Sequence, residues 1–505
     1  MTRTTPRRDR NDASGYWPHI FGLLLTLCLP VLAYPALAQP TATNPTVSAQ
    51  TPPIAPSVRE VVVPPPLTLE GPQGHSYLPS RPLTADEAAG IALRLQPTIA
   101  AARAAIASAQ GRTQQTRAGM LPTLTLSGTY THVENISTQP GAASSGGSNT
   151  GDPTGGVATG GPTTGNSNTA SGFVGVANLR QLLFDFNHTR DLVRQAALQV
   201  NATEDNLARV QSDLVFQVKQ AFYLYVQSGQ ITSINDADVV NRKAQLALAT
   251  ARLNAGLGLP SDVVTAETAL SAATTALIIA RNNEMLARIN LALLMGIDPR
   301  TPLTPAAASE PPPPTNDMQT LIDVALKQRP EIKQALKLIS SAQFGVSAAH
   351  SSNAPAISGN FGVVSRGDRF IPGNDTLNLG LTLIWNPLDG GLSGGKVKEA
   401  RANVDTARAQ LAGAQQTVIS DVSQSYVSLR NSEQRVVATD TGIANAEEGV
   451  RIAQGRFNRG LGLFLDIINA QAALVAAKND RAAAQYGVDQ ARTAISHAIG
   501  AGLPH

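Results

Sequence analysis

Apolar residues recur in a seven-residue frame along two long parts of the chain that contain no proline. The frame holds Val193, Ala196, Val200, Leu207, Val210, Leu214 and Ala221 in the first part, and Val397, Ala400, Val404, Ala407, Leu411, Ala414 and Val418 in the second. A sustained heptad repeat is typical of long helices that supercoil with their neighbours. We therefore predict an unbroken helix from about His188 to Ala255, about 100 Å long at 1.5 Å per residue. The second part predicts a similar helix.

A pattern of period two precedes each long helix and predicts two strands in each half. Apolar positions alternate with Thr, Ser and Asn over 122–130, and again over 357–363 and 377–385, and a further strand is expected over 173–184. The apolar set is Leu124, Leu126, Tyr130, Ile357, Phe361, Val363, Leu377, Leu379, Leu381, Leu383 and Trp385. An apolar face opposite a hydroxyl-rich face is typical of a half-buried strand. We expect four such strands in the chain.

The two halves of the chain are copies of one another. The sequence RLNAGLGLPSD at 252–262 returns as RFNRGLGLFLD at 456–466, 204 residues later, with seven of the eleven positions identical. The same offset relates 182–296 to 386–500 without a gap. Such self-similarity indicates two equivalent units. Each unit reads as a helix interrupted by a proline, then strand, loop, strand, long helix, turn and return helix.

Proline and glycine mark the boundaries between these parts. Residues 39–82 and 299–315 are rich in proline and are expected to be extended, whereas the Gly/Ser/Thr/Asn tract 141–172 predicts a flexible loop. The first repeat then covers 83–298 and the second covers 316–503. In the turns of the two hairpins, glycines supply the backbone conformation, and Ser261 or Asp262 is expected to cap the returning helix.

Residues 1–38 have the organisation of a secretory signal peptide. An Arg-rich start precedes the apolar run 20–33, and Ala36-Leu37-Ala38 offers a small-residue cleavage site. Cys28, the only cysteine, lies within this run without a lipobox before it. We expect a cleaved chain with no lipid and no disulfide, a retained N-terminal anchor being the alternative. No later run reaches about 18 continuous apolar residues, so no transmembrane helix is predicted.

Composition and charge exclude several classes of function. Of 39 basic and 36 acidic residues, four Arg and two Asp lie in the first 38 positions, which leaves 35 against 34, a net charge of +1. This balance gives no support for binding to nucleic acid. The seven histidines show no metal-ligand spacing, and no catalytic constellation or cofactor motif is present. We expect no enzyme activity, no metal site and no cofactor.

A glycine-rich stretch, GGLSGGK at 390–396, matches most of a phosphate-binding loop. However, Val397 stands where such a loop needs a Ser or Thr for magnesium. The equivalent join in the first repeat, 186–189, contains no glycine. We therefore predict a strand-to-helix turn here and no nucleotide site.

Four two-faced strands in an exported chain without a membrane helix pose a topological problem. A sheet that spans a membrane cannot leave an open edge in lipid, and four strands cannot close a barrel with a lumen. Several chains must therefore contribute to one barrel, and each continues into helices too long for the membrane. This combination predicts a hydroxyl-lined duct that reaches into the periplasm.

The duplicated order of short motifs resembles the TolC-like outer-membrane efflux proteins. The motifs are Gln96-Pro97 and Arg329-Pro330 in the first helices, Leu121-Pro122 before the first strand, LLFD at 182–185 and WNPLD at 385–389 after the paired strands, and the two tips NAGLGLPSD and NRGLGLFLD. The resemblance covers about Leu83 to Gly502. It implies a mainly α protein with a membrane β-barrel. Three chains form twelve strands, four from each, continuous with a long α-helical coiled-coil barrel.

The function that this resemblance implies is a passive exit duct of a tripartite efflux or type I secretion system. The duct would cross the outer membrane, extend into the periplasm and be gated at its periplasmic tip. Its implied partners are outer-membrane lipid, a periplasmic adaptor, and an inner-membrane pump, either a proton-driven RND protein or an ATP-driven ABC protein. The alternative from the residues alone is a periplasmic adaptor or a coiled-coil tether without a barrel.

The resemblance also implies roles for residues at the two tips. Asp466, Asn469 and the equivalent Asp262 are implied to form the periplasmic gate. Three copies of Asp466 around a pore would favour cations and offer oxygen ligands to a divalent ion, whereas helix capping is the plainer role for the aspartates. The implied adaptor contacts are Gly256, Leu257, Gly258, Gly460, Leu461 and Gly462.

Two further sets of residues leave their roles open at this stage. The family closes its tip with a Tyr and an Arg, but Phe457 and Gly462 stand at those positions, so Arg456 or Arg459 is a candidate replacement. The aromatic residues Tyr130, Phe184 and Trp385 either anchor the strands at the membrane interface or simply stand at strand ends.

Overall fold

The computed structural model describes residues 82–134, 169–306, 309–313, 315, 317–367 and 374–501, all within one compact unit, Glu70–His505. Its elements are α1 (Ala85–Leu95), α2 (Pro97–Ala118), β1 (Thr123–Glu134), β2 (Thr169–Phe184), α3 (His188–Asn254), α4 (Pro260–Met295), α5 (Met318–Gln328), α6 (Pro330–Ser351), β3 (Ala356–Gly367), β4 (Asn374–Ile384), α7 (Leu392–Asn458) and α8 (Phe464–Ala498). The order helix, helix, strand, strand, helix, helix occurs twice. The predicted internal repeat is therefore confirmed.

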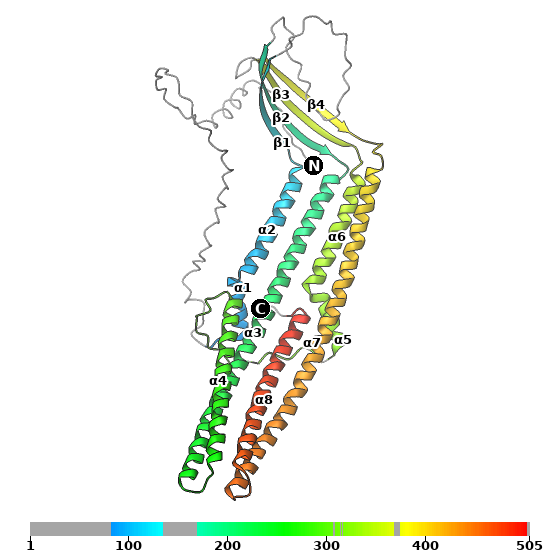
Figure 1. Ribbon diagram of the computed structural model, residues 1–505. Coiled ribbons are helices and arrows are strands. Elements are labelled where there is room, and N and C mark those ends of the chain that lie inside the picture. Colours follow the sequence, from blue (N-terminus) through cyan, green and yellow to red (C-terminus); the bar gives the residue numbers. More distant parts are fainter. Residues whose placement is uncertain are drawn as a thin grey trace, which may run out of the picture. The chain divides into compact units, whose positions relative to one another are not determined.

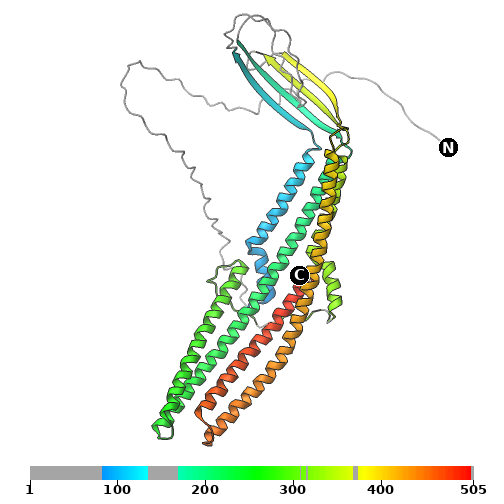
Figure 2. The same cartoon turned by 45° about the vertical axis from the view of Figure 1, so that its right-hand side comes forward.

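The helices form two hairpins that lie side by side. In each repeat a helix of 67 residues, α3 or α7, turns back as α4 or α8 (Figure 1). The shorter helices α2 and α6 pack against α3 and α7, and α3 also contacts α6 and α8, so the two repeats interlock. Figure 2 shows both tips at the end of the helices that lies away from the strands.

The four strands form one antiparallel sheet in the order β1-β2-β3-β4. The apolar positions pair with one another across the sheet: Leu124 lies opposite Leu179, which lies opposite Phe361, which lies opposite Leu379. The pairing Thr125, Asn178, Gly362, Asn378 follows on the other face. The predicted alternation of an apolar face and a polar face is confirmed. The edges of β1 and β4 have no partner strand within the described residues.

Local sequence signals fix the ends of the helices. Thr84 and Glu87 form a capping box at the start of α1, in which each side chain accepts a hydrogen bond from the other residue's N–H group. Proline occupies the first position of α2, α4 and α6, where its missing N–H costs no helical hydrogen bond. Gly296, with φ +73°, ends α4 in the left-handed conformation that glycine adopts readily.

An apolar cluster in each repeat holds the short helices against the long ones. In the first cluster Phe222 of α3 is fully buried together with Leu291 of α4 and Ile99 of α2. In the second cluster Val422 of α7 is buried with Leu321 of α5. Full burial of a side chain of this size contributes about 1.5–3 kcal/mol. These clusters set where the broken first helix of each repeat meets its hairpin.

The Pro-rich segment after the first repeat packs across the middle of the helices as an extended strap, defined here as the described residues of 299–313. The Leu83 N–H donates to the Thr304 carbonyl at 2.8 Å, and the Tyr225 hydroxyl of α3 donates to the Leu303 carbonyl at 2.8 Å. Leu303 is buried. The sequence predicted an extended linker here, and the structure adds that it is packed.

Glu310 of the strap is the centre of a buried cluster of charges. Its carboxylate accepts hydrogen bonds from Lys219 Nζ at 2.8 Å and from the Tyr223 hydroxyl at 3.0 Å. Lys219 also pairs with Asp86 of α1 at 2.8 Å. Burial alone would lower the pKa of Lys219, but the hydrogen bonds and charges of Asp86 and Glu310 outweigh it and raise that pKa. The cluster ties the strap to α1 and α3.

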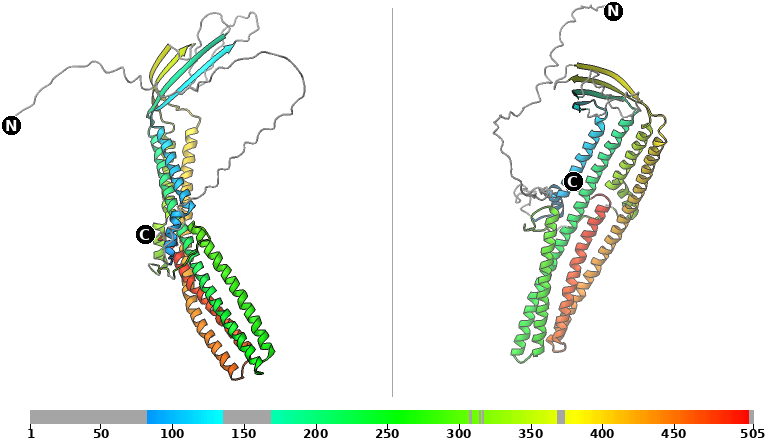
Figure 3. Two further views of the ribbon diagram at one scale, coloured as in Figure 1. Left: turned by 90° about the vertical axis from the view of Figure 1, so that its left-hand side faces the viewer. Right: turned by 45° about the horizontal axis from the view of Figure 1, so that its top comes forward.

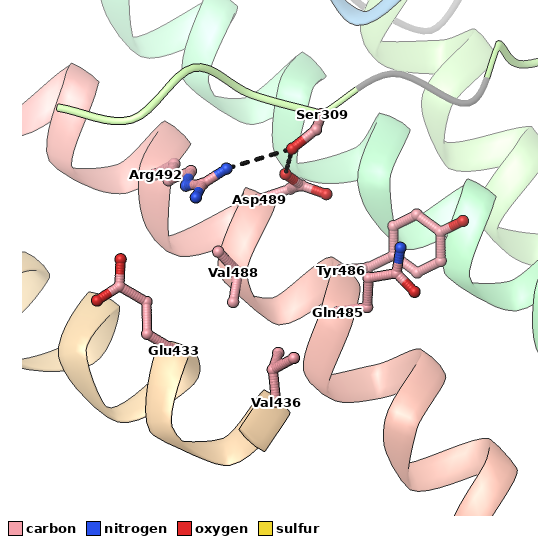
Figure 4. A pocket seen from close by; sticks show the side chains of 8 residues that line it. All are labelled: Ser309, Glu433, Val436, Gln485, Tyr486, Val488, Asp489 and Arg492. Atoms are coloured by element: carbon pink, nitrogen blue, oxygen red, sulfur yellow. Dashed lines mark hydrogen bonds between the residues drawn. The ribbon is translucent and has the colours of Figure 1, made fainter. Parts of the chain in front are cut away.

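The strap is bound equally to the second repeat. Asp489 of α8 accepts hydrogen bonds from the Ser309 hydroxyl at 2.7 Å and from the Glu310 N–H at 3.1 Å. Arg492 donates to Ser309 at 3.3 Å and to the Glu310 carbonyl at 3.0 Å. Figure 4 shows Ser309, Asp489 and Arg492 at the edge of an open pocket of about 420 Å³ between α7 and α8. The strap therefore joins α3 of one repeat to α8 of the other.

Helix α4 has the length and composition of a membrane-spanning helix, with a mean hydropathy of 1.6 in its most apolar window. No membrane-spanning helix was predicted here from the sequence, because Thr, Asn and Arg interrupt the apolar run of α4. In the structure α4 is the return helix of the first hairpin and packs along α3. Its apolar residues thus take part in packing between helices.

Several predictions concern parts of the chain outside the described residues. They are the signal peptide at 1–38 with Cys28, the Pro-rich segment before residue 82, and the loop up to residue 168. Strand β2 begins at Thr169, four residues before the predicted start, because its first residues pair with the end of β1. Residues 169–172 therefore belong to the strand and not to the predicted loop.

Replacing Glu310 with Gln tests the buried charge cluster. The substitution removes the buried carboxylate and leaves Lys219 with only the exposed Asp86 as an ionic partner, and breaking a buried pair costs about 3–5 kcal/mol. We expect the thermal unfolding midpoint of the protein in mild detergent to fall by several degrees. The control is Asp298→Asn, which breaks an ion pair with Arg300, a residue whose side chain is 90% exposed. Equal midpoints for the two variants would contradict a buried, stabilising cluster.

Candidate functional site

Two glycines with different functions shape the first hairpin tip. Gly256 has φ +73°, and the N–H groups of Gly256 and Leu257 donate to the carbonyls of Leu253 and Arg252, each at 2.9 Å. This left-handed residue ends α3 and satisfies its last carbonyls. At Gly258 a Cβ atom would lie only 3.0 Å from the Leu253 nitrogen and 3.1 Å from the Arg252 Cβ. The second glycine is favoured because a side chain there would crowd the backbone at the end of α3.

The second tip repeats this geometry. Gly460 has φ +74°, and the N–H groups of Gly460 and Leu461 donate to the carbonyls of Phe457 and Arg456, each at 2.9 Å. A Cβ atom at Gly462 would lie 3.0 Å from the Arg456 Cβ. The duplicated Gly-Leu-Gly motif is thus explained by backbone conformation at its first glycine and by a close approach at its second.

The leucine between the two glycines is exposed in both tips. Leu257 is 81% exposed and Leu461 is 76% exposed. The leucines that precede the return helices, Leu259 and Leu463, are exposed as well. Single exposed apolar residues are common, but two at the apex of each of two equivalent tips form the kind of patch that marks an interaction surface.

Asp466 lies in the first turn of α8 and caps it. Its carboxylate accepts a hydrogen bond from the Leu463 N–H at 3.0 Å. Asn469 follows one turn later, and both side chains are exposed to solvent. A carboxylate near a helix N-terminus is also favoured by the helix dipole. The capping role expected for Asp466 is observed, and its exposure leaves the second oxygen accessible.

Asp262 occupies the equivalent position in α4 but does not cap it. Within the described residues no hydrogen bond reaches its carboxylate, and it is half-buried. The N-cap position is taken by Leu259 and the first helical position by Pro260. The prediction that Ser261 or Asp262 caps this helix is therefore wrong. The two aspartates are equivalent in sequence but differ in their hydrogen bonding.

Side chains from the two hairpins meet close to the tips. The Arg252 guanidinium of α3 lies over the ring of Phe457 of α7, 4.4 Å from the ring centroid. The Phe457 ring in turn lies 5.6 Å from that of Phe464 at the start of α8. Behind this contact, apolar residues of both hairpins form one buried cluster. Phe457 is thus joined to the first hairpin by Arg252, and neither Arg456 nor Arg459 makes this contact.

A second connection between the hairpins was not predicted from the sequence. Arg242 of α3 is 4% exposed, pairs with Asp238 at 3.1 Å, and donates to the carbonyl of Ile468 in α8 at 3.2 Å. The equivalent positions in the second repeat are Gly442 and Ala446. The charged pair is thus present in the first repeat and absent from the second. This difference between two otherwise similar copies is the sequence signal that would have indicated a special role for Asp238 and Arg242.

The aromatic residues of the strands lie at two levels of the exposed apolar face. Phe184 ends β2 and Trp385 directly follows β4, both at the side where the strands join the helices. Tyr130 lies further along β1, and its ring contacts Phe173 of β2 at 4.6 Å. All three predicted interface residues are at least half exposed.

The glycine-rich stretch after β4 is a turn into α7. Gly390 and Gly391 have φ +65° and +91°, and the equivalent Phe186 and Asn187 adopt φ +53° and +67°. In both repeats the preceding aspartate accepts a hydrogen bond from an N–H group in the first turn of the following helix. Glycine suits this left-handed pair of positions, which accounts for the stretch without a phosphate ligand.

The chain is similar to known proteins in both sequence and fold. The family model described as outer membrane efflux protein matches residues 89–297 and 321–501. The outer membrane efflux protein BepC of Brucella suis is 28% identical over 339 residues, which are 65% of this chain and 72% of BepC.

Solved structures show the same fold. The outer membrane protein VceC of Vibrio cholerae superposes with a TM-score of 0.67 at 19% identity, over 83% of this chain and 97% of VceC. The open state of the MtrE outer membrane channel of Neisseria gonorrhoeae gives a TM-score of 0.66 at 17% identity, over 83% of this chain and 89% of MtrE.

Substituting Asn for each glycine of the first tip separates their two functions. Asn adopts the left-handed conformation, so Gly256→Asn should change amide hydrogen exchange at the end of α3 by less than about threefold. Gly258→Asn places a side chain against the α3 backbone, and we expect exchange there to accelerate by about tenfold or more, which corresponds to about 1.4 kcal/mol. Similar exchange in the two variants would contradict these assignments.

Proposed function

The chain belongs to the outer membrane efflux protein family, and we propose that it is the outer-membrane exit duct of a tripartite efflux or type I secretion system. The observation that carries this proposal is the open four-stranded sheet whose apolar face is exposed and whose strands continue into hairpins of 67-residue helices. The family is one of transport proteins, and the residues offer no support for an enzyme. A periplasmic adaptor or tether without a barrel is not favoured by this membership.

Unpaired strand edges require pairing with other chains, and we propose that the chain forms a homotrimer. The outer edges of β1 and β4 expose backbone N–H and C=O groups, and each such group costs several kcal/mol when it is left unpaired in lipid. Pairing β1 of one chain with β4 of the next around a threefold axis satisfies both edges. Three chains then supply twelve strands, a number that closes a barrel around an aqueous lumen.

The exposed apolar face is suited to contact with outer-membrane lipid. Leu379 is 83% exposed and Leu381 is 76% exposed in the single chain. Phe184 and Trp385 at one end of this face, with Tyr130 further along, would lie at the two membrane interfaces where aromatic residues are favoured. The helical part, about 100 Å long, then extends into the periplasm. Export through a cleaved, non-lipidated signal peptide completes this proposed route.

The hairpin tips are the proposed contact with a periplasmic adaptor. The Gly-Leu-Gly turns hold Leu257 and Leu461 in a fixed, exposed position, so little conformational entropy would be lost when a partner covers them. The adaptor would connect the duct to an inner-membrane pump of the RND or ABC class. BepC is described as an outer membrane efflux protein and MtrE as an outer membrane channel, and both descriptions agree with this role.

The gate is proposed to lie where the tips of three chains converge. Asp466, Asn469 and Asp262 would line the narrowest part, and three exposed Asp466 carboxylates would favour cations. The contact of Arg252 with Phe457 holds the second hairpin against the first within each chain. Opening would require the second hairpin to move away from that contact.

The first experiment determines the native mass in mild detergent and tests efflux in a strain that lacks the chain. We expect a trimer extracted from outer membranes that restores resistance to exported compounds. A double variant, Leu257→Asp with Leu461→Asp, should remain trimeric but lose restoration, because charged tips cannot bury against an adaptor. The matched control, Leu257→Met with Leu461→Met, should restore resistance. A monomer that needs no detergent would contradict the duct and favour a tether.

Arg252 and Asp466 are expected to have separable effects on single-channel currents in planar bilayers. A cation–π contact is worth about 0.5–2 kcal/mol, so Arg252→Ala should raise the open population by about 2- to 30-fold, with Arg252→Lys in between. Asp466→Asn should reduce cation selectivity through loss of charge at the gate. Unchanged opening in Arg252→Ala would refute its role in closing the tip.

A further inference from the structure

The inter-strand register places two arginines on the same face of the sheet. Arg180 of β2 lies opposite Thr123 of β1 and Asn360 of β3. Arg366 of β3 lies opposite Val174 of β2 and Asn374 of β4. Positions 174 and 180, and positions 360 and 366, are separated by an even number of residues within a regular stretch of strand, so they share a face. Both arginines therefore lie on the face opposite the exposed leucines.

On strand β3 this face is less exposed than the apolar face. Val364 and Ser358, which lie on it, are only 7% and 3% exposed, whereas Phe361 on the opposite face is 41% exposed. The curvature of the sheet is visible in Figure 3. With the apolar side toward lipid, the face of the arginines is the inner face, which lines the lumen of the proposed barrel.

The charge on the inner face is of one sign. Among the described strand residues, no Asp or Glu shares the face with Arg180 and Arg366, because Asp375 pairs with Ser365 and Glu134 pairs with Thr169, which places both on the opposite face. Neither arginine forms an ion pair with another described residue. Their neighbours across the strands are Thr123, Asn360 and Asn374, which are neutral. Each chain thus places two guanidinium groups on the inner face that have no acidic partner among the described strand residues.

We propose that Arg180 and Arg366 make the membrane part of the duct selective for anions and anionic solutes. This inference rests on the proposed barrel and specifies what that barrel admits. A trimer contains six guanidinium groups in two rings, about 20 Å apart along the strands at 3.3 Å per residue. Charges of one sign inside a narrow lumen with low-dielectric walls concentrate counter-ions there.

The two ends of the duct then differ in charge. The tip presents the Asp466 carboxylates together with the exposed Arg456 and Arg459, and the strand region presents the two arginine rings. An anionic solute released past the gate would be drawn toward the rings, while a cationic solute would meet its barrier there. Because guanidinium stays protonated at any ordinary pH, the selectivity of the strand region should not change between pH 5 and pH 9.

The test measures reversal potentials in planar bilayers under a KCl gradient. The Asp262 and Asp466 carboxylates of the tip are removed in all samples by Asp262→Asn and Asp466→Asn, so that they do not oppose the selectivity of the strand region. We expect this parent to be more permeable to Cl⁻ than to K⁺. Adding Arg180→Gln and Arg366→Gln should lower the Cl⁻ to K⁺ permeability ratio by a factor of roughly three or more at 0.1 M salt, where the Debye length is about 10 Å. The matched control, Arg180→Lys with Arg366→Lys, keeps the charge and should keep the ratio.

A second measurement does not depend on the Gln variants assembling. Inorganic triphosphate, added on the strand side of the parent channel, should reduce the current at micromolar to millimolar concentration, and the reduction should weaken at 1 M salt as the Debye length falls to about 3 Å. Spermine added on the same side should have no such effect at equal concentration.

These measurements distinguish a failure of the arginine rings from a failure of the proposed duct. Equal permeability ratios in the parent, Gln and Lys variants, or block by spermine in place of triphosphate, would overturn the arginine rings while leaving the duct intact. A trimer that conducts no ions in any variant would overturn the duct itself and the inference with it.

Discussion

An antiparallel sheet with two open edges is the constraint on which the rest of this protein depends. Lipid supplies no hydrogen bonds to the backbone, so β1 and β4 cannot remain unpaired in a membrane. The apolar face of the sheet is exposed, and its opposite face carries polar side chains. Both features are those of a segment of a barrel, and a single chain supplies only four strands. Association of several chains is therefore part of the fold and not an addition to it.

The helices impose the second constraint. The two repeats share one architecture, but equivalent positions in them have different neighbours. The buried charges are where the copies diverge. Lys219 and Arg242 of the first repeat correspond to Ser423 and Ala446 of the second. Lys219 holds the strap through Glu310, and Arg242 reaches the α8 backbone. These two charged residues of the first hairpin have no charged counterpart in the second, whereas Asp489 and Arg492 of the second hairpin bind the strap from the other side.

The distribution of charge divides the duct into regions with separate tasks. Polar connections in the middle of the helices are buried and paired, and they serve stability. The tip carries an exposed carboxylate at Asp466, and the inner strand face carries Arg180 and Arg366. Exposed charges that make no ion pair add little to stability. We connect these charges with transport because they lie along the route that a solute would take through the proposed duct, from the tip to the strands.

Local periodicity and duplication were enough to determine the elements. The heptad frame indicated α3 and α7, the alternation indicated the two faces of each strand, and the repeated glycines indicated the two tips, because each signal lies within a few turns of one segment. The sequence could not determine contacts between distant segments. The burial of Glu310 in a Pro-rich strap, the place of Arg252 over Phe457 and the reach of Arg242 to α8 depend on how helices far apart in the chain pack. Alternation alone also left open which positions of neighbouring strands share a face. Only the register, set by hydrogen bonds across the sheet, brought Arg180 and Arg366 to the same side.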